Sequence, residues 1–288
     1  MANLKEIRNR ITSIKSTMQI TSAMKMVSAA KLKKAQDAII AMRPYSSKLT
    51  ELLQNLSATL DGDTGGVYSN QREVSKVLLV VVTSNRGLCG GFNSSIVKET
   101  VRTIKEKYST ATVDLFGIGK KGGDVLSKEY NLVETRNDIF DDLTFDNVAG
   151  IAEKLMSLFA DGTYDKIEII YNQFKNAATQ IAQVEQFLPI KPIEGGDPSA
   201  VNSDYIFEPS KVEIIEALIP KSLKTQLYKA IRDSFASEHG ARMTAMHKAT
   251  DNAKELRDDL LLTYNKARQA AITNEILEIV GGAEALNN

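Results

Sequence analysis

The first 60 residues repeat apolar side chains at alternating steps of four and three positions. Eight of the eleven positions in this series are apolar, which predicts a long helix with a coiled-coil seam. The series consists of Ile7, Ile11, Ile14, Met18, Thr21, Lys25, Ser28, Leu32, Ala35, Ile39 and Met42. From Thr21 to Ser28 the seam turns polar, while an apolar stripe that includes Met24 runs beside it. We therefore expect this helix to meet more than one neighbour. Asn3 and Glu6 have the spacing of a capping box at its start.

A second helical pattern occupies the other end of the chain. It starts at Ser210 and Glu213, which have the spacing of another capping box, and its apolar positions recur at helical intervals as far as Ile279. Gly281 and Gly282 predict that the helix stops there. Both terminal helices offer seams with many small residues, so we expect them to pack closely on each other.

The middle of the chain alternates strand-like and helix-like runs. The expected strands are 77–83, 112–117, 166–171 and 181–190, and the expected helices are 93–108, 123–130 and 147–160. Such alternation favours a mostly parallel sheet with helices on its faces. The predicted fold class is therefore α/β, with a long antiparallel coiled coil of the N- and C-terminal helices plus a Rossmann-like α/β domain. The expected domains are 1–60 and 210–288 for the two helices and 75–191 for the α/β domain, with linkers at 61–75 and 191–211.

Composition narrows the class of protein further. The chain is 43% hydrophobic and 25% charged, with 36 basic and 36 acidic residues, as is usual for globular proteins. The longest wholly apolar run, 77–82, is too short to span a bilayer, and no secretory signal is expected. Cys89 is the only cysteine, which excludes a disulfide within the chain and a multi-thiolate zinc site. Residues 1–48 carry ten basic and two acidic residues, a net charge of +8, but no aromatic residue precedes Tyr45, so we do not expect nucleic-acid binding.

The strongest candidate for ligand binding is the run Gly117–Gly122. It matches G-x-G-x-x-G, follows an expected strand and precedes a helix, so it could hold a pyrophosphate. However, it follows the second strand, and the acidic residues about 20 positions on, Asp138, Asp141 and Asp142, are expected in a loop rather than at a strand end. We interpret Gly117–Gly122 as a tight turn. The glycines of Gly87–Gly91 lack the ending of a P-loop and are interpreted as structural.

The chain offers no convincing metal or catalytic site. His239 and His247 are eight positions apart and do not face each other on a helix, so we expect both to be solvent-exposed. Asp61 and Asp63 begin like a calcium loop, but the twelfth position is Arg72 instead of glutamate. We predict no catalytic residue, no metal ligand and no cofactor site in this chain.

Four segments of the chain resemble the γ subunit of F-type ATP synthases. They are ITSAMKMV at 20–27, RGLCGG at 86–91 with Asn93, ATDNA at 249–253 preceded by Arg242, Met243, Ala245 and Met246, and YNKARQA at 264–270. The resemblance runs over essentially the whole chain and implies a non-catalytic subunit, the central rotor shaft of a rotary ATPase active in ATP synthesis and hydrogen ion transport.

The resemblance also implies partners and contacts. The terminal helices would turn inside a ring of three α and three β subunits, and the α/β domain would bind the ε subunit and rest on the c-ring. Met24, Arg242, Arg268 and Gln269 correspond to partner-contact residues or to segments important for coupling. The chain lacks the two-cysteine insertion of chloroplast relatives and a transit peptide. This points to a peripheral protein at the cytoplasmic face of a bacterial membrane, which it would meet only through the c-ring.

Two other classes of protein stay open at this point. One is a dinucleotide-binding enzyme whose long helices dimerise, and the other is a coiled-coil adaptor without a rotary partner. Nucleotide titration would distinguish the first from a shaft, and co-purification with α and β subunits would distinguish the second.

Overall fold

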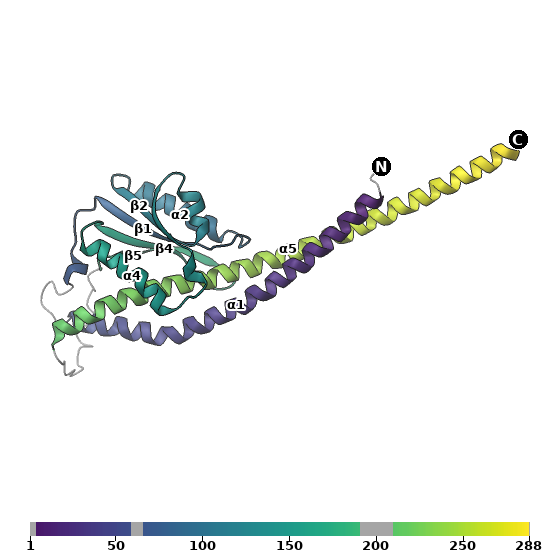
Figure 1. The fold of residues 1–288 in the computed structure, drawn as a ribbon. Coiled ribbons are helices and arrows are strands. Elements are labelled where there is room, and N and C mark those ends of the chain that lie inside the picture. The colour runs from purple at the N-terminus through teal and green to yellow at the C-terminus, as the bar shows by residue number, and fades with distance from the viewer. Residues whose placement is uncertain (1–3, 59–65, 191–209, 288) are drawn as a thin grey trace. The chain divides into compact units, whose positions relative to one another are not determined.

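The computed structural model describes residues 4–58, 66–190 and 210–287. Two long helices, α1 (Leu4–Ala58) and α5 (Lys211–Asn287), enclose the other elements in the sequence (Figure 1). Between them come η1 (Gly66–Ser69), β1 (Lys76–Val82), α2 (Phe92–Lys107), β2 (Thr112–Ile118), α3 (Lys120–Leu126), β3 (Asn131–Arg136), η2 (Asp138–Phe140), α4 (Phe145–Ala160), β4 (Lys166–Phe174) and β5 (Gln180–Leu188).

The chain divides by its internal contacts into two units. One consists of residues 1–28 and 243–288, and the other of residues 29–242. Both long helices contribute to both units, because the division falls inside α1 and inside α5.

In the first unit α1 and α5 form an antiparallel pair. Thr250 Oγ1 donates a hydrogen bond to Thr21 Oγ1 at 2.8 Å, and Lys25 Nζ lies 3.4 Å from His247 Nδ1. The residue number therefore falls along one helix as it rises along the other. The predicted antiparallel coiled coil is confirmed, and the polar part of its seam is where a cross-helix hydroxyl pair forms.

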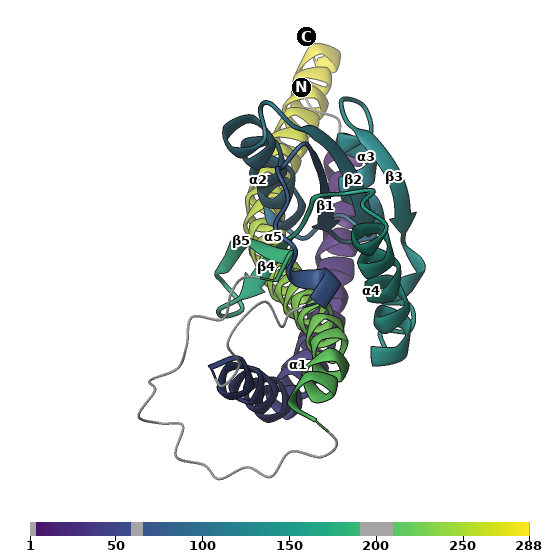
Figure 2. The same ribbon diagram turned by 90° about the vertical axis from the view of Figure 1, so that its left-hand side faces the viewer.

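The second unit contains a five-stranded sheet in the order β3-β2-β1-β4-β5 (Figure 2). The first four strands are parallel, and β5 runs antiparallel to β4. A central strand of a parallel sheet is covered on both faces, which explains why Val77–Val82 is apolar without alternation. The expected mostly parallel sheet is confirmed.

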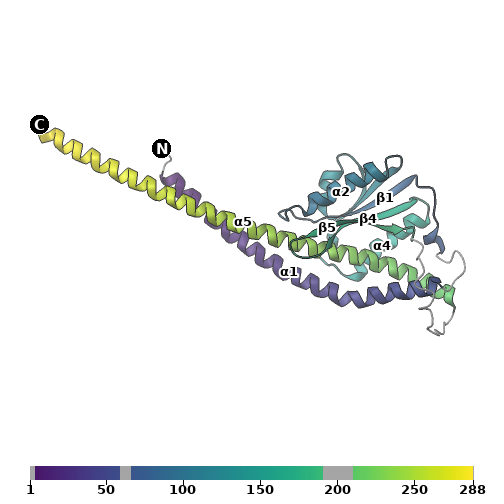
Figure 3. The same cartoon turned by 180° about the vertical axis from the view of Figure 1, so that it is seen from behind.

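Helices cover both faces of the sheet. One face packs against α4 and against the beginning of α5, where Ile219, Leu223, Leu227 and Ile231 are buried. The other face packs against α2 and α3, with Ile96 and Leu126 buried among residues of β1, β2 and β4. Seen from behind, α2 and the first part of α5 lie on opposite sides of the sheet (Figure 3). The first turns of α5 are thus part of the core of the α/β fold.

Two of the predicted helices have wrong boundaries, and one strand was not predicted. The helix expected at 123–130 begins three residues earlier and ends at Leu126. The edge strand β3 was not expected, because its sequence NLVETR is polar and only half-buried. Helix α5 continues through Gly281 and Gly282, since neither glycine takes the left-handed conformation that closes a helix.

The helix start expected at Ser210 is confirmed by a hydrogen bond of 3.3 Å from Glu213 N–H to the Ser210 hydroxyl, while the Glu213 carboxylate accepts a bond of 3.1 Å from that hydroxyl as well. The cap expected at Asn3, the acidic pair Asp61 and Asp63, and residues 191–209 of the second linker lie outside the described residues.

Candidate functional site

The glycine motif forms the turn between β2 and α3. Gly119 stands at the N-cap of α3 with φ +95° and ψ 148°, a backbone conformation essentially restricted to glycine. A Cβ atom on Gly119 would lie 2.1 Å from the carbonyl oxygen of Thr83, and one on Gly122 would lie 2.8 Å from Thr83 Cγ2. The glycines are therefore required because the end of β1 passes directly against the turn.

The amide groups of this turn already have partners within the chain. Gly122 N–H donates to Thr83 Oγ1 at 2.9 Å, Lys121 N–H to the Ser84 carbonyl at 3.0 Å, and Lys120 N–H to Asn85 Oδ1 at 3.1 Å. These are the donors that a bound pyrophosphate would need. The segment Thr83–Asn85 occupies the place of the phosphate, in agreement with the interpretation of a tight turn.

The acidic residues after the motif lie closer to a strand end than expected. Asp138 follows the end of β3 by two positions and begins η2. Its carboxylate accepts hydrogen bonds from Arg136 Nε at 3.0 Å and Nη2 at 2.8 Å, and this pairing lowers the pKa of Asp138. The carboxylate that could have met a ribose is thus paired with its neighbour on the strand.

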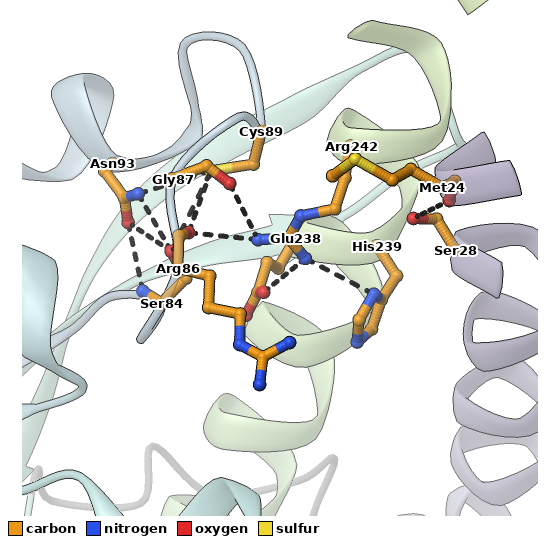
Figure 4. A network of polar contacts seen from close by, with 10 residues as sticks. All are labelled: Met24, Ser28, Ser84, Arg86, Gly87, Cys89, Asn93, Glu238, His239 and Arg242. Carbon is orange, nitrogen blue, oxygen red and sulfur yellow. Dashed lines mark hydrogen bonds and ion pairs between the residues drawn. The ribbon is translucent and has the colours of Figure 1, made fainter. Parts of the chain in front are cut away.

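The second glycine cluster lies in the loop between β1 and α2, which we call the 84–91 loop. Asn93 in α2 holds the base of this loop: Ser84 N–H donates to Asn93 Oδ1 at 3.0 Å, and Asn93 Nδ2 donates to Ser84 Oγ at 2.8 Å (Figure 4). Ser84 Oγ in turn donates to the Arg86 carbonyl at 2.6 Å. A Cβ atom on Gly87 would meet no atom within 4 Å, so packing does not require glycine at this position.

Arg242 of α5 binds the other side of the 84–91 loop. Its Nη2 donates to the carbonyls of Arg86 and Gly87 at 3.0 and 3.3 Å, and its Nη1 donates to Glu238 Oε1 at 2.5 Å (Figure 4). The side chains of Arg242 and Glu238 are only 9% and 10% exposed. Burial raises the pKa of Glu238, and the neighbouring charges of Arg242 and Lys31 oppose this shift. The pair is a buried ion pair whose cation also serves two backbone carbonyls.

The two histidines differ in environment. His247 is exposed as expected, between Lys25 and Asp251. His239 is buried, with 5% of its surface accessible, so the expectation of an exposed side chain is wrong there. It packs edge-on against Phe235 with ring centroids 4.5 Å apart, and burial, aided by Arg242 and Lys31, lowers its pKa to about 3. His239 is therefore a neutral core residue.

The single cysteine belongs to the same loop. Cys89 is buried, and burial raises the pKa of its thiol although a hydrogen bond with Ser84 opposes the shift. A buried thiol with a raised pKa is a poor nucleophile.

The four residues that the resemblance marked as partner contacts lie in different settings. Met24 is half-buried on α1, Arg242 is buried in its own chain, and Arg268 and Gln269 are exposed on α5. Since Thr21 lies opposite Thr250, Met24 is level with about residue 247, so Arg268 is about 30 Å further along the helix at 1.5 Å per residue. Met24 and Arg268 therefore do not form one site.

Sequence reasoning missed Glu238, and it singled out Asn93 only as part of a segment that resembles the family, without a role for its side chain. The four-residue spacing of Glu238 and Arg242 indicates a helical ion pair, but nothing in it identifies the distant loop as a third member.

Among residues 4–58, 66–190 and 210–287, no group of three or more His, Cys, Asp or Glu side chains could hold a metal ion. None of the helices in these described parts combines the length and apolarity needed to span a bilayer.

The fold and the site define a coiled-coil protein with a Rossmann-like domain. In that domain the amides of the glycine turn after β2 bind residues 83–85 of the same chain. A family model described as ATP synthase matches residues 3–286. The ATP synthase gamma chains of Flavobacterium johnsoniae and Christiangramia forsetii are 74% and 65% identical to this chain over 287 residues, which is 100% of each chain. The chain belongs to the ATP synthase gamma chain family.

Solved structures support the same fold. A rotor chain of the Euglena gracilis mitochondrial ATP synthase has a TM-score of 0.69 at 21% identity, covering 93% of this chain and 98% of that one. A chain from the central stalk and c-ring of the Tetrahymena thermophila mitochondrial ATP synthase has a TM-score of 0.58 at 26% identity, covering 80% of this chain and 99% of that one. The expected family and fold class are confirmed.

Proposed function

We propose that this chain is the central rotor shaft of a bacterial F-type ATP synthase and couples proton flow through a c-ring to ATP synthesis and hydrolysis. Family membership over the whole chain supports the role. The chain itself contributes no catalytic residue and no cofactor site, because in this assembly the nucleotides bind to the β subunits.

One observation in the structure carries the proposal. Seventeen positions separate Thr21 from Leu4, so the start of α1 is level with about residue 267 of α5. Beyond that point every described side chain from Arg268 to Ala283 is exposed, including the apolar residues Ile272, Ile276 and Ile279. A single helix with exposed apolar side chains is stabilised when other protein surrounds it. A ring of three α and three β subunits would supply that surrounding surface.

The expected domains correspond to different parts of the rotor. Segments 1–60 and 210–288 would form the shaft, and 75–191 would form the base that binds the ε subunit and the c-ring. Met24, Arg242, Arg268 and Gln269 are the proposed residues of the shaft's coupling contacts. The protein would be peripheral at the cytoplasmic face of the bacterial inner membrane and would reach that membrane only through the c-ring.

Co-purification tests the function directly. A tagged chain isolated from native membranes should bring α and β subunits with it in 3:3:1 proportion. A chain that emerges alone, or as a dimer of itself, would support the coiled-coil adaptor or the dimerising enzyme instead.

Coupling tests the placement of the contact surface. A new interaction that favours one rotary position by about 1.4 kcal/mol slows departure from it about tenfold. Met24 lies half-buried on the apolar stripe that runs beside the seam of α1, whereas Lys34 is exposed. Met24→Asp should therefore lower the number of protons pumped per ATP hydrolysed more than Lys34→Asp does, with both complexes reconstituted in vesicles. Equal coupling in two normally assembled complexes would mean that the contact surface is placed wrongly.

A further inference from the structure

The ring of His247 lies in the polar part of the coil, between two residues of opposite charge. Its Nδ1 atom is 3.4 Å from Lys25 Nζ on α1 and 3.3 Å from Asp251 Oδ2, one turn further along α5. All three residues belong to the first of the two units. One nitrogen atom thus has a donor on the neighbouring helix and an acceptor on its own helix.

A single ring nitrogen serves one of these partners at a time. Without a proton, Nδ1 is an acceptor, and the ammonium of Lys25, which is always a donor, binds it across the coil. With a proton, Nδ1 is a donor that binds Asp251 within α5, and the charged ring faces the ammonium of Lys25 as a second positive charge. Histidine makes this change between about pH 5 and 8.

The other side chains at this level of the coil are uncharged. Among the described residues three and four positions from His247 on α5, Asp251 is the one that carries a charge, and the others are Met243, Thr244 and Thr250. At the same spacings from Lys25 on α1 are Thr21, Ser22, Ser28 and Ala29. The charge of this contact therefore depends on Lys25, His247 and Asp251, and His247 is the member of the three that titrates near neutral pH.

We propose that His247 is a pH-sensitive contact of the coiled coil: neutral, it joins α5 to α1 through Lys25, and protonated, it turns to Asp251 and repels Lys25. Acidification therefore loosens the coil around residues 21–28 and 243–251. The side chains of His247 and Asp251 are 56% and 58% exposed, so solvent screens the charges and the two helices loosen without separating. The proposal concerns the coil itself and goes beyond the shaft function, so either can fail while the other holds.

Nitrogen NMR of the full chain with isotope-labelled histidine tests the change of partner. The chain has two histidines, and burial lowers the pKa of His239 to about 3, so the signal that titrates near neutral pH belongs to His247. At about pH 8 we expect the tautomer with its proton on Nε2, because Nδ1 then accepts from Lys25. Lys25→Met should raise the midpoint of this titration by about 0.5 pH unit, and Asp251→Asn should lower it by about as much.

Lys248→Met is the matched control for Lys25→Met. It also removes a positive charge, from an exposed residue next to His247 in the sequence, but this side chain points about 100° away around the helix. The midpoint should therefore move by less than half as much as in Lys25→Met.

Amide hydrogen exchange, corrected for the intrinsic effect of pH on its rate, tests the effect on the coil. His247→Gln is neutral at every pH and His247→Lys is charged across this range, so the two variants represent the two states. Between about pH 8 and about pH 5.5, exchange in segments 18–28 and 243–253 of the unmodified chain should rise about two- to fivefold. It should begin near the level of His247→Gln and end near that of His247→Lys, and neither variant should show the rise itself.

The proposal is overturned if Nδ1 carries the proton at about pH 8, or if Lys25→Met moves the titration midpoint no more than Lys248→Met does. It is also overturned if His247→Gln shows the same rise in exchange as the unmodified chain, because another group would then be responsible. Failure of the shaft function would appear separately, as an unmodified chain that does not assemble with α and β subunits.

Discussion

Replacing Gly119 by alanine should destabilise the α/β unit severely. The added Cβ would lie 2.1 Å from the carbonyl oxygen of Thr83 and 2.7 Å from its carbonyl carbon. Both are backbone atoms, so no side-chain rotation can relieve the clash. The end of β1 and the start of α3 would have to move apart by about 1 Å or more to reach ordinary van der Waals distance.

The cost can be estimated from three contributions. Alanine at φ +95° costs about 1–3 kcal/mol in backbone strain. Separating the two segments weakens the hydrogen bonds from Lys121 N–H to the Ser84 carbonyl and from Gly122 N–H to Thr83 Oγ1, at about 1 kcal/mol each. Part of the clash will be relieved by these same movements, so the sum is about 3–5 kcal/mol rather than more.

Native-state hydrogen exchange of the β1 amides is the appropriate assay, because it reports the free energy of opening of the sheet without assuming that both units unfold together. Exchange in the Gly119→Ala chain should be faster by about two to four orders of magnitude. Gly150→Ala is the control: it lies in α4 with no atom within 4 Å of its Cβ, and should stabilise that helix by about 0.5–1 kcal/mol. Exchange within about threefold of the unmodified chain for Gly119→Ala would refute the argument.

Three other predictions concern separate parts of the chain. His239 has a pKa of about 3 when folded, below its unfolded value near 6.5, so the unfolded state binds the extra proton and stability falls as the pH drops below about 6.5. His239→Phe should reduce the loss of unfolding free energy between about pH 7 and pH 4.5 by about 2 kcal/mol, and an unchanged loss would contradict the assignment. Thr250→Val should lower the stability of the coiled coil by about 1 kcal/mol in thermal unfolding, and adding Thr21→Val should recover most of it; a double variant worse than the single one would show that the hydroxyl pair is not the cause. Calorimetry should detect no micromolar binding of NAD or ATP to Gly117–Gly122, since the amides of the turn bind Thr83–Asn85; measurable binding would mean that this segment can be displaced.

The periodic parts of the sequence were sufficient to predict most of the fold. Steps of four and three positions identified the helix that became α1, and the apolar run at 77–82 identified the central strand, because burial on both faces leaves no polar position there. Strand β3 was not predicted because it is an edge strand that buries little surface, so its sequence carries no hydrophobic pattern. The stop expected at Gly281 failed because glycine permits a left-handed end but does not impose one.

The candidate site was less accessible to sequence reasoning. Arg242 binds a carbonyl that lies 156 positions away in the chain, and a backbone acceptor has no residue-type signature. The burial of His239 could not be predicted from the sequence either, because it depends on which face of α5 packs against the sheet and α1. The closed glycine turn was correctly interpreted from its position after the second strand, although the residues that close it were not foreseen.

The closed turn also determines what this domain can sense. Thr83–Asn85 is tethered to the turn that it occupies, so its effective concentration there is on the order of millimolar or higher, and it is present at every moment. A free phosphate compound would have to outcompete this internal ligand and break into the sheet at the same time. We therefore expect this domain to be insulated from the nucleotide pool, so that the supply of ATP or ADP influences its movement only by way of the proteins around it.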